Sequence, residues 1–231
     1  METQGNQNHR DIALPKLTLG TWDIRTRHQA DVAVSAAISA GYRGIDSAAC
    51  YENERVIRDA VEKCGIHRGE VFLTSKLWNN AHGYDQALRA FDRSEKELGS
   101  IDMYLIHWPG PVSSFLDTWK AFERLLEEKR VGLIGVSNFM MPQLDILLAN
   151  ANIRPMVNQI ECHLWYVDRL LLDYCRRRNI LVQGYSPLAA GSGLLTDPVL
   201  LAVAARLNRT PAQVALRRKR NPFRRQTRAS H

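Results

Sequence analysis

Short apolar runs alternate with amphipathic stretches along this chain, and the alternation recurs seven times. The runs typical of strands occupy residues 17–22, 42–46, 71–77, 101–107, 131–138, 155–161 and 180–186. Helical patterns occupy 27–41, 52–65, 84–99, 115–129, 141–150 and 167–179, and two more, 197–208 and 210–217, follow the last strand. Such alternation is typical of parallel strands joined by helical crossovers. We therefore predict an α/β fold, for which 231 residues suffice as one domain.

Local signals mark the ends of several predicted helices. Gly41 and Gly99 stand where two helical patterns stop, as glycine often does at a helix end. Thr210 can cap the last helix, and Pro211 suits its first position. These signals indicate where the chain turns back toward the next strand.

Polar or aromatic side chains stand at the carboxyl end of every predicted strand. They are Trp22, Asp46, Lys76, His107, Ser137 with Asn138, Gln159, and Tyr185 with Ser186. A closed parallel barrel brings all its strand ends together around one mouth. A doubly wound sheet gathers functional side chains only near its switch point. Because all seven strands end in this way, we favour a (β/α)8 TIM-type barrel.

Three consecutive strands end in an acid, an amine and an imidazole, and Tyr51 adds a phenol five residues after Asp46. Such groups around one pocket indicate proton transfer. An ammonium group ~4 Å from a phenol would favour the phenolate by up to roughly 4 kcal/mol, which is about three pKa units. We therefore predict that Asp46 keeps Lys76 protonated, and that Lys76 lowers the pKa of Tyr51 and tunes it as a general acid.

Each of these residues has an ordinary structural explanation when it is taken alone. Asp46 could cap a helix, Lys76 could be a solvated strand end, and His107 could be a core histidine. Their order and their spacing of one strand–helix unit favour the functional interpretation. Glu161 and His163 share a strand face, but no further ligands are arranged nearby, so a structural role is preferred and no metal is expected.

The segment GYRGIDSAACYENE, residues 41–54, resembles the signature of the aldo-keto reductase family. Other blocks that resemble the family follow in the family's order: LTSKLW, YLIHWP, IGVSNF, VNQIECH and GYSPLA. The resemblance extends from about residue 12 to about residue 217. It implies a (β/α)8 barrel that uses NADPH to reduce aldehydes or ketones to alcohols.

The resemblance also implies a role for each residue of the site. Tyr51 would give a proton to the carbonyl oxygen. Lys76 would lower the pKa of Tyr51, and Asp46 would hold Lys76. His107 would form a hydrogen bond with the substrate carbonyl and orient it. The residues implied for the cofactor are Ser137, Asn138 and Gln159 at the nicotinamide carboxamide, Tyr185 against the ring, Ser186 and Leu188 along the pyrophosphate, and Thr21 without an assigned contact. The residues implied for the substrate pocket are Trp22, Trp78 and Trp108, which could equally be core residues.

The resemblance stops near Arg217. The family continues with an eighth strand and helix, whereas this sequence reads RRKRNPFRRQTRASH and has no apolar strand there. We expect a barrel domain over residues 1–216 that lacks a recognisable eighth strand and helix, and a basic, disordered tail over 217–231. The first and seventh strands would then have free edges. The family's eighth strand end holds the adenosine 2′-phosphate, so the choice between NADPH and NADH stays open.

The basic tail also explains the net charge of +7. Seven of the 31 basic residues lie in 217–228, which leaves 24 basic residues against 24 acidic ones. The charge therefore carries no information about partners of the barrel. A nucleic-acid function is disfavoured, because the tail has a single aromatic residue, Phe223, and no recognition fold. The expected partner is a small aldehyde or ketone, and the expected state is a monomer.

The amino-terminal segment, the apolar runs and the cysteines indicate in which cellular compartment we expect the chain. The polar start METQGNQNHR is not a secretory signal, and no run of about 18 apolar residues could span a membrane. The four cysteines form no CxxC pair, which suits a reduced compartment. We expect a cytoplasmic enzyme, and the alternative is a weakly active or non-catalytic barrel of the same family that binds a cofactor or a protein.

Overall fold

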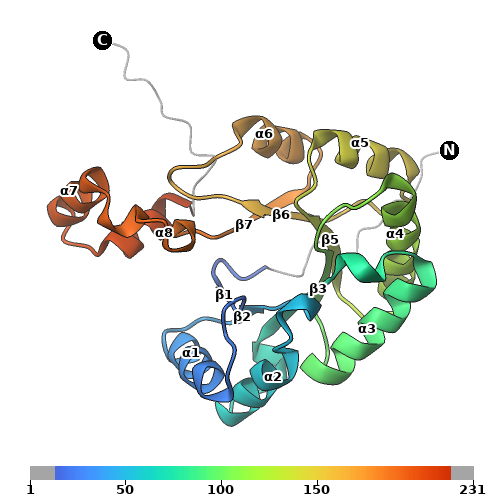
Figure 1. Cartoon of the computed structure of the whole chain (residues 1–231), viewed down its shortest axis with the longest axis horizontal. Coiled ribbons are helices and arrows are strands. Elements are labelled where there is room, and N and C mark those ends of the chain that lie inside the picture. Colours follow the sequence, from blue (N-terminus) through green and yellow to red (C-terminus); the bar gives the residue numbers. More distant parts are fainter. Residues whose placement is uncertain (1–13, 220–231) are drawn as a thin grey trace.

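Seven parallel strands form a curved sheet in the computed structural model, which describes residues 14–219 (Figure 1). The strands are Thr18–Gly20 (β1), Gly44–Asp46 (β2), Phe72–Leu77 (β3), Met103–Ile106 (β4), Leu133–Ser137 (β5), Val157–Glu161 (β6) and Leu181–Tyr185 (β7). Each strand pairs in parallel with the next one along the chain. The predicted barrel-type α/β architecture is confirmed.

Helices α1–α6 surround the strands, whereas α7 and α8 lie together beyond β7 (Figure 1). They are Arg27–Ser39 (α1), Glu54–Lys63 (α2), Tyr84–Leu98 (α3), Val112–Glu127 (α4), Met141–Asn150 (α5), Arg169–Arg177 (α6), Pro198–Arg206 (α7) and Pro211–Lys219 (α8). Gly41 and Gly99 follow helix ends with φ of 86° and 89°, so the predicted glycine stops are confirmed. The predicted start of α8 is also confirmed, because Thr210 Oγ1 accepts a hydrogen bond from the Gln213 backbone at 3.2 Å.

Several helix boundaries differ from the prediction by a few residues, and α4 begins at Val112 and not at residue 115. Helix α2 begins at Glu54 and not at residue 52, because Ala49–Tyr51 forms a separate 3₁₀ helix (η1) and Glu52 adopts a left-handed φ of 55°. Helix α8 continues to Lys219, so residues 217–219 of the expected tail are helical. The rest of that tail, residues 220–231, lies outside the described part of the chain.

Alternate residues of each strand face two different apolar layers. In β4, Tyr104 and Ile106 pack between the sheet and the helices, whereas Met103 and Leu105 pack inside the barrel. All four side chains are fully buried. This period of two is the normal consequence of the pleated backbone. It also determines which polar side chains at the strand ends point into the mouth.

The barrel is open between its first and last strands. Strands β1 and β7 do not pair with each other, and residues 14–219 contain no eighth strand. A cleft of about 1260 Å³ lies between them and reaches Asp46 and Gln159. No helix within the same residues is long and apolar enough to cross a bilayer.

Candidate active site

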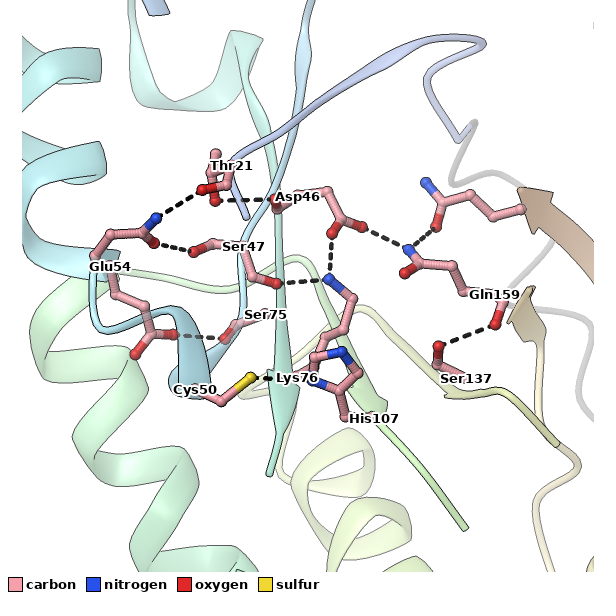
Figure 2. A network of polar contacts seen from close by, with 12 residues as sticks. Thr21, Asp46, Ser47, Cys50, Glu54, Ser75, Lys76, His107, Ser137 and Gln159 are labelled. Carbon is pink, nitrogen blue, oxygen red and sulfur yellow. Dashed lines mark hydrogen bonds and ion pairs between the residues drawn. The ribbon is translucent and has the colours of Figure 1, made fainter. Parts of the chain in front are cut away.

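Three neighbouring strands bring the predicted proton-transfer residues together. Asp46 ends β2, Lys76 lies near the end of β3, and His107 directly follows β4. Parallel pairing of these strands sets their ends side by side, and Figure 2 shows the three side chains converging. Tyr51 ends the 3₁₀ helix η1 that follows β2. The predicted group of four residues therefore meets at one place.

Lys76 is fully buried, and Asp46 holds its ammonium group. Its Nζ contacts Asp46 Oδ1 and donates a hydrogen bond to the backbone carbonyl of Ser47 at 2.8 Å. Burial lowers the pKa of Lys76, but the Asp46 carboxylate and the Tyr51 phenol more than compensate, so the net pKa is raised. Lys76 is therefore a positive charge at neutral pH, as predicted.

Tyr51 lies against that charge, with 5.1 Å between Lys76 Nζ and the centroid of the phenol ring. Burial raises the pKa of Tyr51, and the Lys76 charge offsets only part of the rise. The prediction of a lowered pKa is therefore wrong, because a sequence contains no measure of how far the phenol is removed from water. Tyr51 holds its proton at neutral pH, and Lys76 is placed to stabilise the phenolate once that proton has left.

His107 is a neutral ring in this site. Burial and the charge of Lys76 lower the pKa of His107 to about 3. Its ring is edge-on to Trp78 and to Tyr51, with centroid distances of 5.1 Å and 5.8 Å. The Nδ1 atom lies 3.6 Å from Cys50 Sγ. The imidazole can therefore act as a hydrogen-bond donor without competing for the proton of Tyr51.

A second polar group occupies the ends of β5 and β7. Ser137 Oγ donates a hydrogen bond to the backbone carbonyl of Gln159 at 2.9 Å. The Asn138 side chain donates to the His107 carbonyl at 3.0 Å and accepts from the Tyr185 hydroxyl at 2.9 Å. Four of the residues implied for the cofactor therefore form one network beside His107.

Gln159 links this network to the ion pair. Its Nε2 atom donates to Asp46 Oδ2 at 2.6 Å and to Gln183 Oε1 at 2.8 Å (Figure 2). Both amide hydrogens are thus in use, whereas Oε1 has no hydrogen-bond partner among residues 14–219. Gln183 was not predicted from the sequence, although it lies two residues before the end of β7, where polar side chains signal the site.

Several of the predicted cofactor residues line the cleft between β1 and β7. They are Gln159, Tyr185, Ser186 and Leu188. A free amide acceptor, a serine hydroxyl and an aromatic ring suit a nicotinamide, whose carboxamide both donates and accepts hydrogen bonds. Thr21 does not line this cleft: it is fully buried, and its hydroxyl donates to the backbone carbonyl of Asp46 at 3.1 Å. The set fits a nicotinamide cofactor, and Thr21 supports Asp46.

The three predicted tryptophans lie outside the core. Trp22 is 61% exposed and Trp108 is 43% exposed, in the loops after β1 and β4. Trp78 directly follows β3, is half-buried and packs edge-on against His107. Their positions after strand ends place all three near the mouth, so the alternative of a core role does not apply.

Two polar residues of the sequence motif anchor the turn that carries Tyr51. Asn53 is buried and donates a hydrogen bond to the Thr21 carbonyl at 2.7 Å. Glu54 accepts one from the Ser75 hydroxyl at 2.5 Å. Both residues belong to the family-like motif, but no role was predicted for them from the sequence. They tie η1 to β1 and β3 and so fix where the phenol points.

The Glu161–His163 pair forms a local contact of 3.2 Å between Oε1 and Nε2. Within the described part of the chain, no three histidine, cysteine, aspartate or glutamate side chains are placed to hold a metal ion. The pair lies just before a short turn, which is closed by backbone hydrogen bonds between His163 and Tyr166.

Several known proteins are similar to this chain in sequence and in fold. Residues 16–217 match the Aldo/keto reductase family. The chain is 45% identical over 213 residues to the 9,11-endoperoxide prostaglandin H2 reductase of Trypanosoma cruzi, covering 90% of this chain and 75% of that relative. It is 41% identical over 211 residues to the glyoxal reductase of Bacillus subtilis, covering 90% and 76%. The crystal structure of an aldo-keto reductase from a Medee basin deep-sea metagenome library superposes with a TM-score of 0.84 at 40% identity, covering 88% of this chain and 76% of that one. The chain therefore belongs to the aldo/keto reductase family of oxidoreductases.

Proposed function

We propose that this chain reduces an aldehyde or ketone to the alcohol, with NADPH as the reductant and Tyr51 as the proton donor. The buried Lys76–Asp46 ion pair beside the Tyr51 ring carries the proposal. Burying an ion pair costs free energy, and here its lysine member places positive charge beside the phenol, where negative charge would develop during the reaction. The names of the two curated relatives, a prostaglandin reductase and a glyoxal reductase, support the same class of reaction.

Each residue has one task in this proposal. Tyr51 transfers its proton to the carbonyl oxygen while the carbonyl carbon is reduced. Lys76 stabilises the phenolate that remains, and Asp46 keeps Lys76 in place and charged. The neutral ring of His107 donates a hydrogen bond to the carbonyl oxygen and so orients the substrate. Trp22, Trp78 and Trp108 would form the walls that receive an apolar or aromatic carbonyl compound.

The cofactor would occupy the cleft between β1 and β7. When bound, a reduced nicotinamide supplies the hydride that the carbonyl carbon accepts. Its contacts would be Ser137, Asn138 and Gln159 at the carboxamide, Tyr185 at the ring, and Ser186 and Leu188 at the pyrophosphate. Arg217 lines the same cleft and would add positive charge for the phosphates.

The substitution Tyr51→Phe tests this proposal. We expect the rate of NADPH oxidation with benzaldehyde to fall at least about a hundredfold, because the ring loses the hydroxyl that gives the proton. NADPH binding, followed by tryptophan fluorescence, should be retained. Unchanged turnover at saturating NADPH would remove Tyr51 from the mechanism. NADPH binding without turnover in the unaltered chain would favour the alternative, a barrel that binds cofactor without catalysis.

A further inference from the structure

Cys50 contacts the ring that the proposed function assigns to substrate orientation. It directly precedes Tyr51 in η1, and its Sγ lies 3.6 Å from His107 Nδ1 (Figure 2). Within residues 14–219, no other side chain or backbone group forms a hydrogen bond with either nitrogen of this imidazole. The thiol is therefore the only described group that forms a hydrogen bond with the imidazole, and its contact is with Nδ1.

The chemistry of the two groups determines the direction of the hydrogen bond. Burial raises the pKa of the Cys50 thiol, so the sulfur keeps its hydrogen at neutral pH. The imidazole is neutral, so only one of its nitrogens carries a hydrogen. An unprotonated imidazole nitrogen is a good acceptor, whereas sulfur is a weak one. This chemistry favours a thiol that donates to Nδ1 and a ring hydrogen on Nε2.

We propose that Cys50 is a positioning residue that holds His107 in the tautomer with its hydrogen on Nε2. Nε2 is the ring nitrogen that the thiol leaves free, so this tautomer offers a donor to a carbonyl oxygen. The other tautomer would offer that oxygen a lone pair and repel it. The functional consequence rests on the proposed carbonyl reduction, whereas the tautomer itself does not.

The tautomer can be measured on the full chain without any substrate. Protein labelled with ¹⁵N histidine is examined by long-range proton–nitrogen correlation, and the His107 signals are assigned by their absence in His107→Gln. We expect the Nε2–H tautomer in the unaltered chain and in Cys50→Ser, whose hydroxyl also donates. We expect Cys50→Ala to show a substantial Nδ1–H population. Cys64→Ala is the matched control, because the Cys64 thiol donates to the Ala60 carbonyl within its own helix.

Steady-state kinetics then distinguish a Cys50 that orients His107 by a hydrogen bond from a Cys50 that only packs against the ring. We expect Cys50→Ala to lower kcat/KM for benzaldehyde by about fivefold, the effect of one hydrogen bond, while Cys50→Ser stays within about twofold of the unaltered chain. An Nδ1–H tautomer in the unaltered chain, or an unchanged tautomer in Cys50→Ala, would overturn the proposal. If all forms lack turnover, the proposed function fails, but the spectra still decide the role of Cys50.

Discussion

At the scale of single residues, the site combines a protonated phenol with a charged lysine beside it. Burial raises the pKa of Tyr51 and keeps the proton in place before the reaction. The Lys76 charge acts in the opposite direction, so it lowers the cost of forming the phenolate. Asp46 is held on one carboxylate oxygen by Lys76 and on the other by Gln159. Tyr51 is therefore protonated before the reaction, and Lys76 can stabilise the phenolate that forms when the proton leaves.

Lys76→Met is expected to reduce carbonyl reduction at least about a hundredfold, because the developing phenolate loses its neighbouring charge. The pH dependence is the specific readout. If Tyr51 is the proton donor, as proposed, reduction requires its protonated form, and kcat/KM falls as pH rises through the pKa of that phenol. Removing Lys76 raises this pKa further, so the falling limb should move to higher pH. Thermal unfolding of the variant controls for the unpaired Asp46 carboxylate, and an unmoved limb would disprove the coupling between Lys76 and Tyr51.

At the scale of elements, the tight contacts between β4, β5 and β6 hold the strand ends in register. Gly135 lies opposite Leu105 and Val157 in the neighbouring strands. A Cβ atom added there would approach the Val157 carbonyl oxygen to 2.6 Å and Leu105 Cδ2 to 2.8 Å. Ser137 ends β5 two residues later. This close approach of the backbones therefore helps to fix the position of Ser137 and of the hydrogen bond that it donates to Gln159.

Gly135→Ala should lower the free energy of unfolding by about 1–3 kcal/mol, because the added methyl group overpacks the interior. Gly20→Ala is the matched control, since Gly20 is also a strand glycine and an added Cβ would meet nothing within 4 Å. Its effect should stay within about 0.5 kcal/mol. Chemical denaturation of both variants measures the difference. Equal stabilities would mean that the β5–β6 spacing adjusts freely.

The strands, most helix ends and the group of four site residues were predictable because their signals are local. Apolar runs, glycine at helix stops and polar residues at strand ends can all be read along the chain, as Gly41 and His107 illustrate. The contact between Cys50 and His107 spans 57 residues, and that between Gln159 and Asp46 spans 113. Such contacts, and the burial that raises the pKa of Tyr51, depend on tertiary packing. Sequence patterns do not encode them in a form that can be read directly.

At the scale of the whole molecule, the described barrel has one open side. Strands β1 and β7 each pair with a single neighbour, and the cleft between them leads to Asp46 and Gln159. Lysine and arginine side chains line this cleft together with the candidate cofactor residues. The cleft and the proton-transfer group therefore meet at the barrel mouth. We propose that hydride transfer and proton transfer take place there side by side.

Transfer of deuterium from the cofactor to the carbonyl carbon tests the proposed hydride transfer. The full chain is incubated with benzaldehyde and NADPH that carries deuterium at both C4 positions of the nicotinamide, and the benzyl alcohol formed is examined by mass spectrometry. We expect one deuterium on the carbinol carbon of each product molecule, with the hydroxyl hydrogen supplied by Tyr51 and exchangeable with water. Product without deuterium on carbon, or bound NADPH with no product at all, would contradict it.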